Sequence, residues 1–147
     1  QRSTTGAMRS SKGEPQSPLA AREVLQATPC GDTLPSKLPT LIEVDGGTSA
    51  LSVLGVCCKN KISSVPVRNA ARKHVALVDL LDLAHVLVHG ERADASVLAG
   101  TTARAAANAS KRNVFTRVGE GAPLLAAIDV MAAHNCRRVP IVDTEGD

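Results

Sequence analysis

Residues 62–67 read Ile-Ser-Ser-Val-Pro-Val, and residues 137–142 read Arg-Arg-Val-Pro-Ile-Val. When the chain is compared with itself at an offset of about 74 positions, with no gap, the two Val-Pro pairs coincide. The same offset superimposes further apolar and glycine positions, namely Val44 on Val118, Gly47 on Gly121, Leu51 on Leu125 and Leu54 on Ile128. The chain therefore contains two copies of one structural unit.

The stretch before the first Val-Pro pair predicts a strand followed by a helix. Residues 41–44 are mostly apolar, Gly46 and Gly47 turn the chain, and Thr48 sits at the expected N-cap. The helix ends at residues 60–61. Its apolar stripe at i, i+3 and i+7 predicts an inward face made of Leu51, Leu54 and Cys58, repeated in the second copy by Leu125, Ile128 and Ala132. Pro123 falls in the first turn of the second helix.

The stretch from residue 62 to residue 90 completes the unit. The Val-Pro segment is too short and too β-branched for a helix, so it predicts a second strand, parallel to the first. Pro66 suggests an edge strand or a bulge. A third strand is expected over residues 74–78, followed by a helix with Leu83, Val86 and Leu87 inward and Gly90 as its stop. The unit is therefore β-α-β-β-α.

The flanking segments divide the rest of the chain. Residues 1–17 are polar and predicted to be disordered. Residues 18–37 are expected to form a lead-in helix and linker that docks on the first domain, residues 38–90. Residues 91–112 read as a linker, ordered or not. Residues 113–147 match only the N-terminal part of a second domain, so we expect the chain to be a piece of something longer.

Composition excludes several classes of function. The chain is 44% hydrophobic with a single aromatic residue, Phe115, which leaves no row of aromatic rings for stacking nucleic-acid bases. The net charge of +3 is spread along the chain, which argues against a nucleic-acid partner. No apolar run is long enough for a membrane-spanning helix. A soluble protein is therefore expected, and the four cysteines, which lack a CxxC pair or zinc-ligand spacing, favour a cytoplasmic location.

Neither catalytic nor metal-binding residues stand out. No Ser/His/Asp set, P-loop or dinucleotide-binding fingerprint is present. His85 and His89 share a helix face but have no acidic third ligand beside them, so no metal site is predicted. Cys57 and Cys58 lie on the first helix, where core packing is expected rather than redox chemistry. The sequence gives no basis for an enzyme or for a required cofactor.

The repeated unit resembles the cystathionine β-synthase (CBS) domain, which occurs in tandem. The likeness rests on the order of elements, the two Val-Pro strands and the segment LVDLLDLAHVL at residues 77–87. It implies an α/β (α+β) fold in which the two CBS domains pack about a pseudo-two-fold axis as a Bateman module. Residues 108–115 and 136–140 are most similar to CBS pairs related to the gamma subunit of AMP-activated protein kinase.

The resemblance implies binding residues for an adenosine nucleotide between the two domains. The backbone of the Val-Pro strands would flank the base, through Ser64, Val65 and Pro66 in the first copy and Val139 and Pro140 in the second. An Asp that opens the last helix would hold the ribose hydroxyls, and Asp82 is the matching residue. The same Asp could instead be a helix cap.

Two further positions bear on the phosphates. The family usually has Thr or Ser three residues before the ribose Asp, whereas this chain has Asp79, which would repel a phosphate or simply lie at a solvated strand end. Arg138 matches an Arg that reaches phosphates in the kinase gamma subunits, although it could be an ordinary surface charge. Arg137 and Arg117 are weaker candidates.

The sequence thus predicts a regulatory module that senses AMP, ADP, ATP or S-adenosylmethionine and modulates a partner. The expected partner is a second copy of the chain, in a homodimer, or a protein kinase-type protein. A rival hypothesis is a CBS interaction scaffold that holds no nucleotide. A third makes the chain the regulatory part of a larger enzyme or transporter. These three alternatives stay open at the level of sequence.

Overall fold

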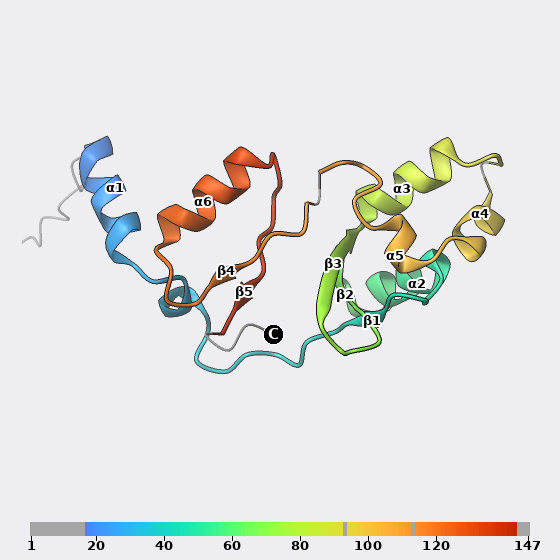
Figure 1. The fold of residues 1–147 in the computed structure, drawn as a ribbon, viewed down its shortest axis with the longest axis horizontal. Coiled ribbons are helices and arrows are strands. Elements are labelled where there is room, and N and C mark those ends of the chain that lie inside the picture. The colour runs from blue at the N-terminus through green and yellow to red at the C-terminus, as the bar shows by residue number, and fades with distance from the viewer. Residues whose placement is uncertain (1–16, 93, 113, 144–147) are drawn as a thin grey trace, which may run out of the picture.

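The computed structural model describes residues 17–92, 94–112 and 114–143. It contains two units that lie side by side (Figure 1). The first copy of the repeat comprises β1 (Val44–Asp45), α2 (Ala50–Asn60), β2 (Ser64–Arg68), β3 (His74–Asp79) and α3 (Leu80–His89). The second comprises β4 (Val118–Gly119), α6 (Leu124–Ala133) and β5 (Ile141–Val142). The predicted disordered segment lies outside the described residues except for Ser17, which caps the helix α1 (Pro18–Ala27).

The first copy has the predicted β-α-β-β-α order, and its strands form one sheet in the order β1-β2-β3. β1 and β2 are parallel and are connected through α2, whereas β2 and β3 are antiparallel. In the second copy β4 and β5 are likewise parallel and connected through α6. This mixture of parallel crossovers with an antiparallel hairpin confirms the α+β fold class.

Pro66 lies in the central strand, but a register shift beside Val67 supplies the bulge that the proline predicted. The Ser63 carbonyl accepts a hydrogen bond from the Leu80 N–H on the β3 side, so by alternation Pro66 faces the β1 side. Pairing with β1 starts only at Val67, opposite Val44. The missing N–H of Pro66 therefore interrupts no bond of that ladder.

The inward face of α2 was predicted one residue out of register. Its buried residues are Ala50, Val53 and Cys57, whereas Leu51 is 40% exposed and Cys58 is exposed. Leu54, the third predicted residue, is partly buried and does pack against the core. The buried set has the same i, i+3, i+7 spacing but begins with a small residue, which made the leucine stripe look stronger. α6 shows the same shift, with Ala127 buried and Ile128 exposed.

The starts of these two helices also differ from the prediction. Ser49, not Thr48, caps α2 and accepts from the Ser52 N–H at 3.2 Å. The Thr48 N–H instead donates to the Asp45 carbonyl at 2.9 Å, which closes the turn after β1. Pro123 is the N-cap of α6, immediately before its first turn. By contrast, α3 has Leu83 buried and ends at Gly90, as expected.

The prediction that the lead-in helix docks on the first domain was wrong. α1 packs against α6 of the second copy, at the opposite end of the molecule from the first sheet (Figure 1). Just after α1, Cys30 is fully buried in the core of the second copy with Val118 and Ala127. The sequence could not place α1, because its own residues carry no contact information beyond a weak stripe.

Residues 91–112, read as a linker, complete the first copy. They form α4 (Ala95–Gly100) and α5 (Ala103–Ala106), which pack against α2 and α3. Leu98, Ala103 and Ala106 are buried in the core of the first copy. Each copy is thus closed by the segment that precedes the other one.

The backbone contacts of these two segments repeat the internal symmetry. The Ala103 N–H donates to the Thr48 carbonyl at 2.6 Å, and the Cys30 N–H donates to the Ala122 carbonyl at 2.8 Å. The donors Cys30 and Ala103 lie about 74 positions apart in the sequence, and so do the acceptors Thr48 and Ala122, which is the offset of the repeat. This mutual exchange joins the two copies by non-covalent contacts in addition to the peptide chain that connects them. None of the helices in the described ranges has the length and apolar character needed to span a bilayer.

Candidate ligand site between the two copies

The Val-Pro strands of the two copies face a shared cavity of about 560 Å³. Its walls come from the extended segment 39–42, from β2 and β3, and from residues 115–142 of the second copy. Most of the lining is apolar, and the polar contributions are Thr40, Ser64, His74, Arg117 and Arg138. This size and lining are typical of small-molecule sites.

A second cavity of about 370 Å³ is polar. It lies at the start of α3, where Leu80 and Leu81 line it, and it is bordered by three arginines and one carboxylate, namely Arg112, Arg137, Arg138 and Asp79. Arg112 and Arg137 form no ion pair within the described part of the chain. The second cavity therefore favours an anion.

Arg138 lines both cavities and crosses from the second copy to the first. Its guanidinium donates to Asp79 Oδ2 at 3.0 Å and to Ser63 Oγ at 2.9 Å. The Arg138 side chain is 37% exposed, whereas that of Asp79 is only 11% exposed. Arg138 is therefore a specific contact between the two copies and not an unattached surface charge.

Asp79 is buried, which rules out the solvated strand end considered for it. It is the N-cap of α3, and its Oδ1 accepts from the Asp82 N–H at 2.9 Å while its Oδ2 binds Arg138. Asp79 at the N-cap and Asp82 three residues later form a capping box. The pairing with Arg138 offsets the negative charge that was expected to repel a phosphate.

Asp82 is fully buried and lines neither cavity. Its Oδ2 accepts from the Asp79 N–H at 3.2 Å, as the other half of the capping box. Its Oδ1 accepts from the N–H and the hydroxyl of Ser110, at 3.0 and 2.6 Å. The cap is thus formed, and the predicted ribose contact stays a prediction.

The remaining predicted residues divide between the cavity and the core. Ser64 and Pro66 from β2 line the larger cavity, and so do Val139 and Pro140. Val65 is fully buried in the core of the first copy and lines neither cavity, so only its backbone is available to a ligand. The alternation of β2 explains this, because neighbouring side chains point to opposite faces.

Sequence reasoning missed the contributions of the linker and of Phe115 to the two cavities. Arg112 belongs to the linker, and its neighbour Lys111 gives a short basic run that could have drawn attention to it. Phe115, the only aromatic residue, lines the larger cavity with the Arg117 guanidinium 5.9 Å from the centre of its ring. A flat group in this cavity would therefore have one aromatic wall.

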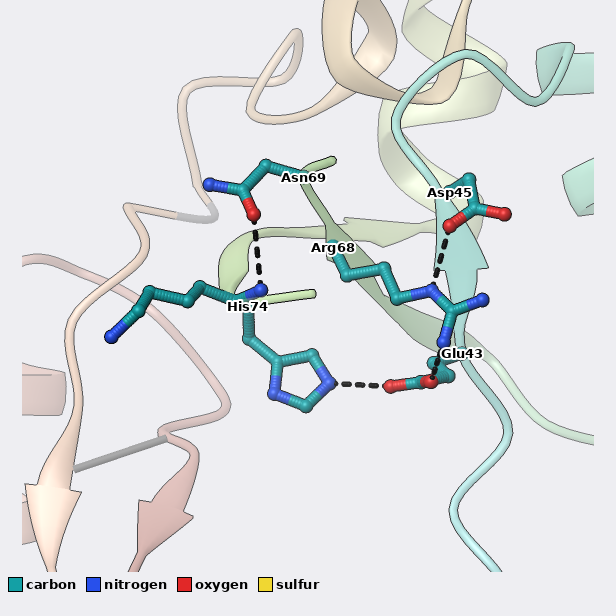
Figure 2. A network of polar contacts seen from close by, with 6 residues as sticks. Glu43, Asp45, Arg68, Asn69 and His74 are labelled. Atoms are coloured by element: carbon teal, nitrogen blue, oxygen red, sulfur yellow. Dashed lines mark hydrogen bonds and ion pairs between the residues drawn. The ribbon is translucent and has the colours of Figure 1, made fainter. Parts of the chain in front are cut away.

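A charged network joins Glu43, which directly follows the wall segment 39–42, to the sheet (Figure 2). Glu43 accepts hydrogen bonds from Arg68 at 2.6 Å and from the His74 ring at 2.7 Å. Arg68 also donates to Asp45 at 2.6 Å. The hydrogen bond from His74 and the charge of Arg68 hold the pKa of Glu43 below its ordinary value. Because His74 lines the larger cavity, this network connects the cavity wall to the strand that follows it.

The structure offers little for redox or metal chemistry. Burial raises the pKa of the Cys57 thiol, and the nearby Cys58 and Asp79 add to the effect, so Cys57 stays protonated and packs as a small apolar residue. His85 and His89 stack with their ring centres 4.2 Å apart. Among the described residues no group of three His, Cys, Asp or Glu side chains could hold a metal ion.

The comparisons with known proteins agree with this architecture. The family model of the CBS domain matches residues 110–147. No curated protein matches the chain. Among solved structures, the CBS domain protein PAE2072 from Pyrobaculum aerophilum complexed with AMP has a TM-score of 0.63 at 21% identity, covering 80% of this chain and 81% of that one.

Two further solved structures were found with other ligands. The CBS domain of the bacterial CNNM/CorC family Mg2+ transporter in complex with ATP has a TM-score of 0.65 at 17% identity, covering 87% and 82%. The CBS domain pair of protein MJ0100, in complex with 5-methylthioadenosine and S-adenosyl-L-methionine, has a TM-score of 0.58 at 20% identity, covering 81% and 83%. At these identities the likeness shows the fold, and the resemblance to kinase gamma subunits stays a prediction.

Proposed function

We propose that this chain, whose residues 110–147 match the CBS-domain family model and whose fold is that of a CBS-domain pair, is a non-catalytic regulatory module that binds an adenosine nucleotide between its two copies. The base and sugar would lie in the larger, mainly apolar cavity. The phosphates would lie in the smaller cavity among Arg112, Arg137 and Arg138. A partner protein or an attached domain would respond to the binding of the nucleotide.

One observation carries this proposal: Arg138 lines both cavities and so joins an apolar site to an anion site at the boundary between the copies. A nucleotide has the same division into a flat, uncharged half and a negatively charged half. Planar guanidinium groups bind phosphate oxygens in pairs. The charge distribution favours AMP, ADP or ATP over S-adenosylmethionine, whose sulfonium is cationic.

The position of Arg138 also supplies a route to regulation. In this structure Arg138 comes from the second copy and binds Asp79 and Ser63 of the first. A phosphate that recruits Arg138 would compete with Asp79 for it and change the contact between the copies. A ligand that binds one arrangement more tightly shifts the population toward it. The relative packing of the two copies is therefore the quantity that a nucleotide would control.

A second candidate function is a scaffold that holds no nucleotide. It is favoured by the same Asp79–Arg138 pair, because a carboxylate already satisfies the best phosphate-binding arginine. In this alternative the pair simply fixes the two copies together. The two functions differ in whether an adenosine compound stabilises the folded chain.

Thermal unfolding with AMP, ADP, ATP, adenosine and S-adenosylmethionine distinguishes them. A ligand at 100 times its Kd adds roughly 2.7 kcal/mol to the free energy of unfolding. We expect stabilisation by the phosphorylated compounds, lost in Arg138→Met and retained in the control Arg22→Met, whose side chain lies on the exposed face of α1. If no compound stabilises the folded protein, the scaffold stands in its place.

A further inference from the structure

The contact between Asp82 and Ser110 deepens the proposed function, on which the inference below rests. Asp82 is a fully buried carboxylate at the start of α3, and Ser110 belongs to the linker between the two copies. Ser110 donates both its N–H and its hydroxyl to the same oxygen, Asp82 Oδ1. A linker residue thus covers the carboxylate that the family resemblance assigns to ribose.

The hydrogen bonds that Asp82 already accepts leave little room for a ribose hydroxyl beside them. A carboxylate oxygen has two lone pairs, and Oδ1 already accepts two hydrogen bonds. Oδ2 accepts from the Asp79 N–H and so maintains the capping box. A ribose hydroxyl can therefore reach Oδ1 only when Ser110 leaves it.

The segment around Ser110 is built so that it can change its conformation locally. Asn108 and Lys111, on either side of it, have φ values of 60° and 58°, a left-handed conformation that costs energy for residues with a Cβ. The nearest backbone bonds are local turns, from Ala109 to Ala106 and from Lys111 to Asn108. The bonds from Ser110 to Asp82 hold this segment against the start of α3.

We propose that Ser110 and the ribose of a bound nucleotide compete for Asp82, so that nucleotide binding displaces residues 108–112 from the start of α3. Arg112 is carried by this segment, and its long side chain stays with the phosphates in the smaller cavity while the backbone moves away from Asp82. The linker then reports occupancy, since it changes its contact with the first copy when the nucleotide arrives. Ser110 is a positioning residue that sets nucleotide affinity.

Isothermal titration of ATP and AMP into the wild-type chain and Ser110→Ala tests the competition. Without the hydroxyl the linker competes less well, so we expect Ser110→Ala to bind about tenfold more tightly. Ser96→Ala is the matched control, because Ser96 also donates its hydroxyl to an aspartate, Asp94, in the same linker but outside both cavities. Its affinity should equal that of the wild type.

Amide hydrogen exchange of the wild-type chain gives an independent readout that needs no variant. Saturating ATP should speed exchange of the residues 108–112 while it slows exchange around residues 62–66. If the wild type binds nucleotide but Ser110→Ala binds equally or more weakly, or if residues 108–112 become protected, the competition is wrong and the proposed function stands. If neither protein binds any nucleotide, both are wrong.

Discussion

Arg138 and Asp79 form the contact on which both proposed functions depend. Asp79 has two tasks, because one oxygen caps α3 and the other binds Arg138. A phosphate that takes Arg138 would leave the cap intact, so the exchange costs the ion pair with Asp79 and the hydrogen bond to Ser63. A carboxylate that departs from the family pattern is therefore compatible with phosphate binding, although it lowers the affinity.

Asp79→Asn tests this account of affinity. Asparagine is as good an N-cap as aspartate, so α3 should keep its start while Arg138 loses its charged partner. We expect ATP to bind about tenfold more tightly and adenosine to bind unchanged, as measured by titration calorimetry. An equal change for ATP and adenosine would contradict an electrostatic role for Asp79.

Glu43 should make the chain sensitive to acid. Its pKa is lowered in the folded chain, by the hydrogen bond from His74 and then by the charge of Arg68, so its stabilising contribution is complete above the ordinary value of 4.5. The contribution is lost as pH falls through the lower, folded value. Urea unfolding between pH 7 and pH 3 should show a decline below pH 4.5 that is smaller in Glu43→Gln.

The matched control for this measurement is Glu23→Gln on the exposed surface of α1. It should follow the wild-type curve throughout. If Glu43→Gln also follows that curve, the network in Figure 2 does not contribute to stability.

At the scale of single elements, the packing of α2 separates two stripes that look alike in the sequence. Val53 is fully buried between the sheet and the linker helices, whereas Leu51 is 40% exposed. We expect Val53→Ala to lower the free energy of unfolding by about 2 kcal/mol and Leu51→Ala by about 0.5 kcal/mol or less. Chemical denaturation measures both, and a larger loss for Leu51→Ala would favour the register predicted from the sequence.

The strands and the long helices could be predicted because their signals are local. The first Val-Pro strand, β2, follows from neighbouring residues, and so do the end of α2 at Lys61 and the stop at Gly90. The second predicted strand, β5, begins only after the Val139-Pro140 pair. α4 and α5 have only 6 and 4 residues, too few for a stripe to be recognised. Their caps at Asp94 and Thr102 were a readable signal that they are helical.

The lining of the larger cavity was predictable only where the repeat itself marked it. Ser64 and Pro66 belong to β2, Val139 and Pro140 directly precede β5, and all four line the larger cavity. The burial of Asp82 under Ser110 depends on how a linker folds back over a helix, and no local pattern encodes that contact. The same holds for the pairing of Asp79 with Arg138, which are distant in the sequence.

For the whole molecule, the exchange of segments makes each copy depend on residues before the other. Leu98 in α4 is 4% exposed and packs in the core of the first copy. We expect Leu98→Ala to cost about 3 kcal/mol of stability, as for a core leucine. Denaturation would contradict the exchange if the loss were below about 0.5 kcal/mol, the level of a surface substitution.

The central claim, that a nucleotide lies between the two copies, is tested most directly by photolabelling with 8-azido-ATP and mapping the labelled peptides by mass spectrometry. The account predicts label on residues 39–42 or 62–66 of the first copy and on residues 138–142 of the second, abolished by excess ATP. Label confined to other parts of the chain, or label that ATP does not compete away, would contradict it.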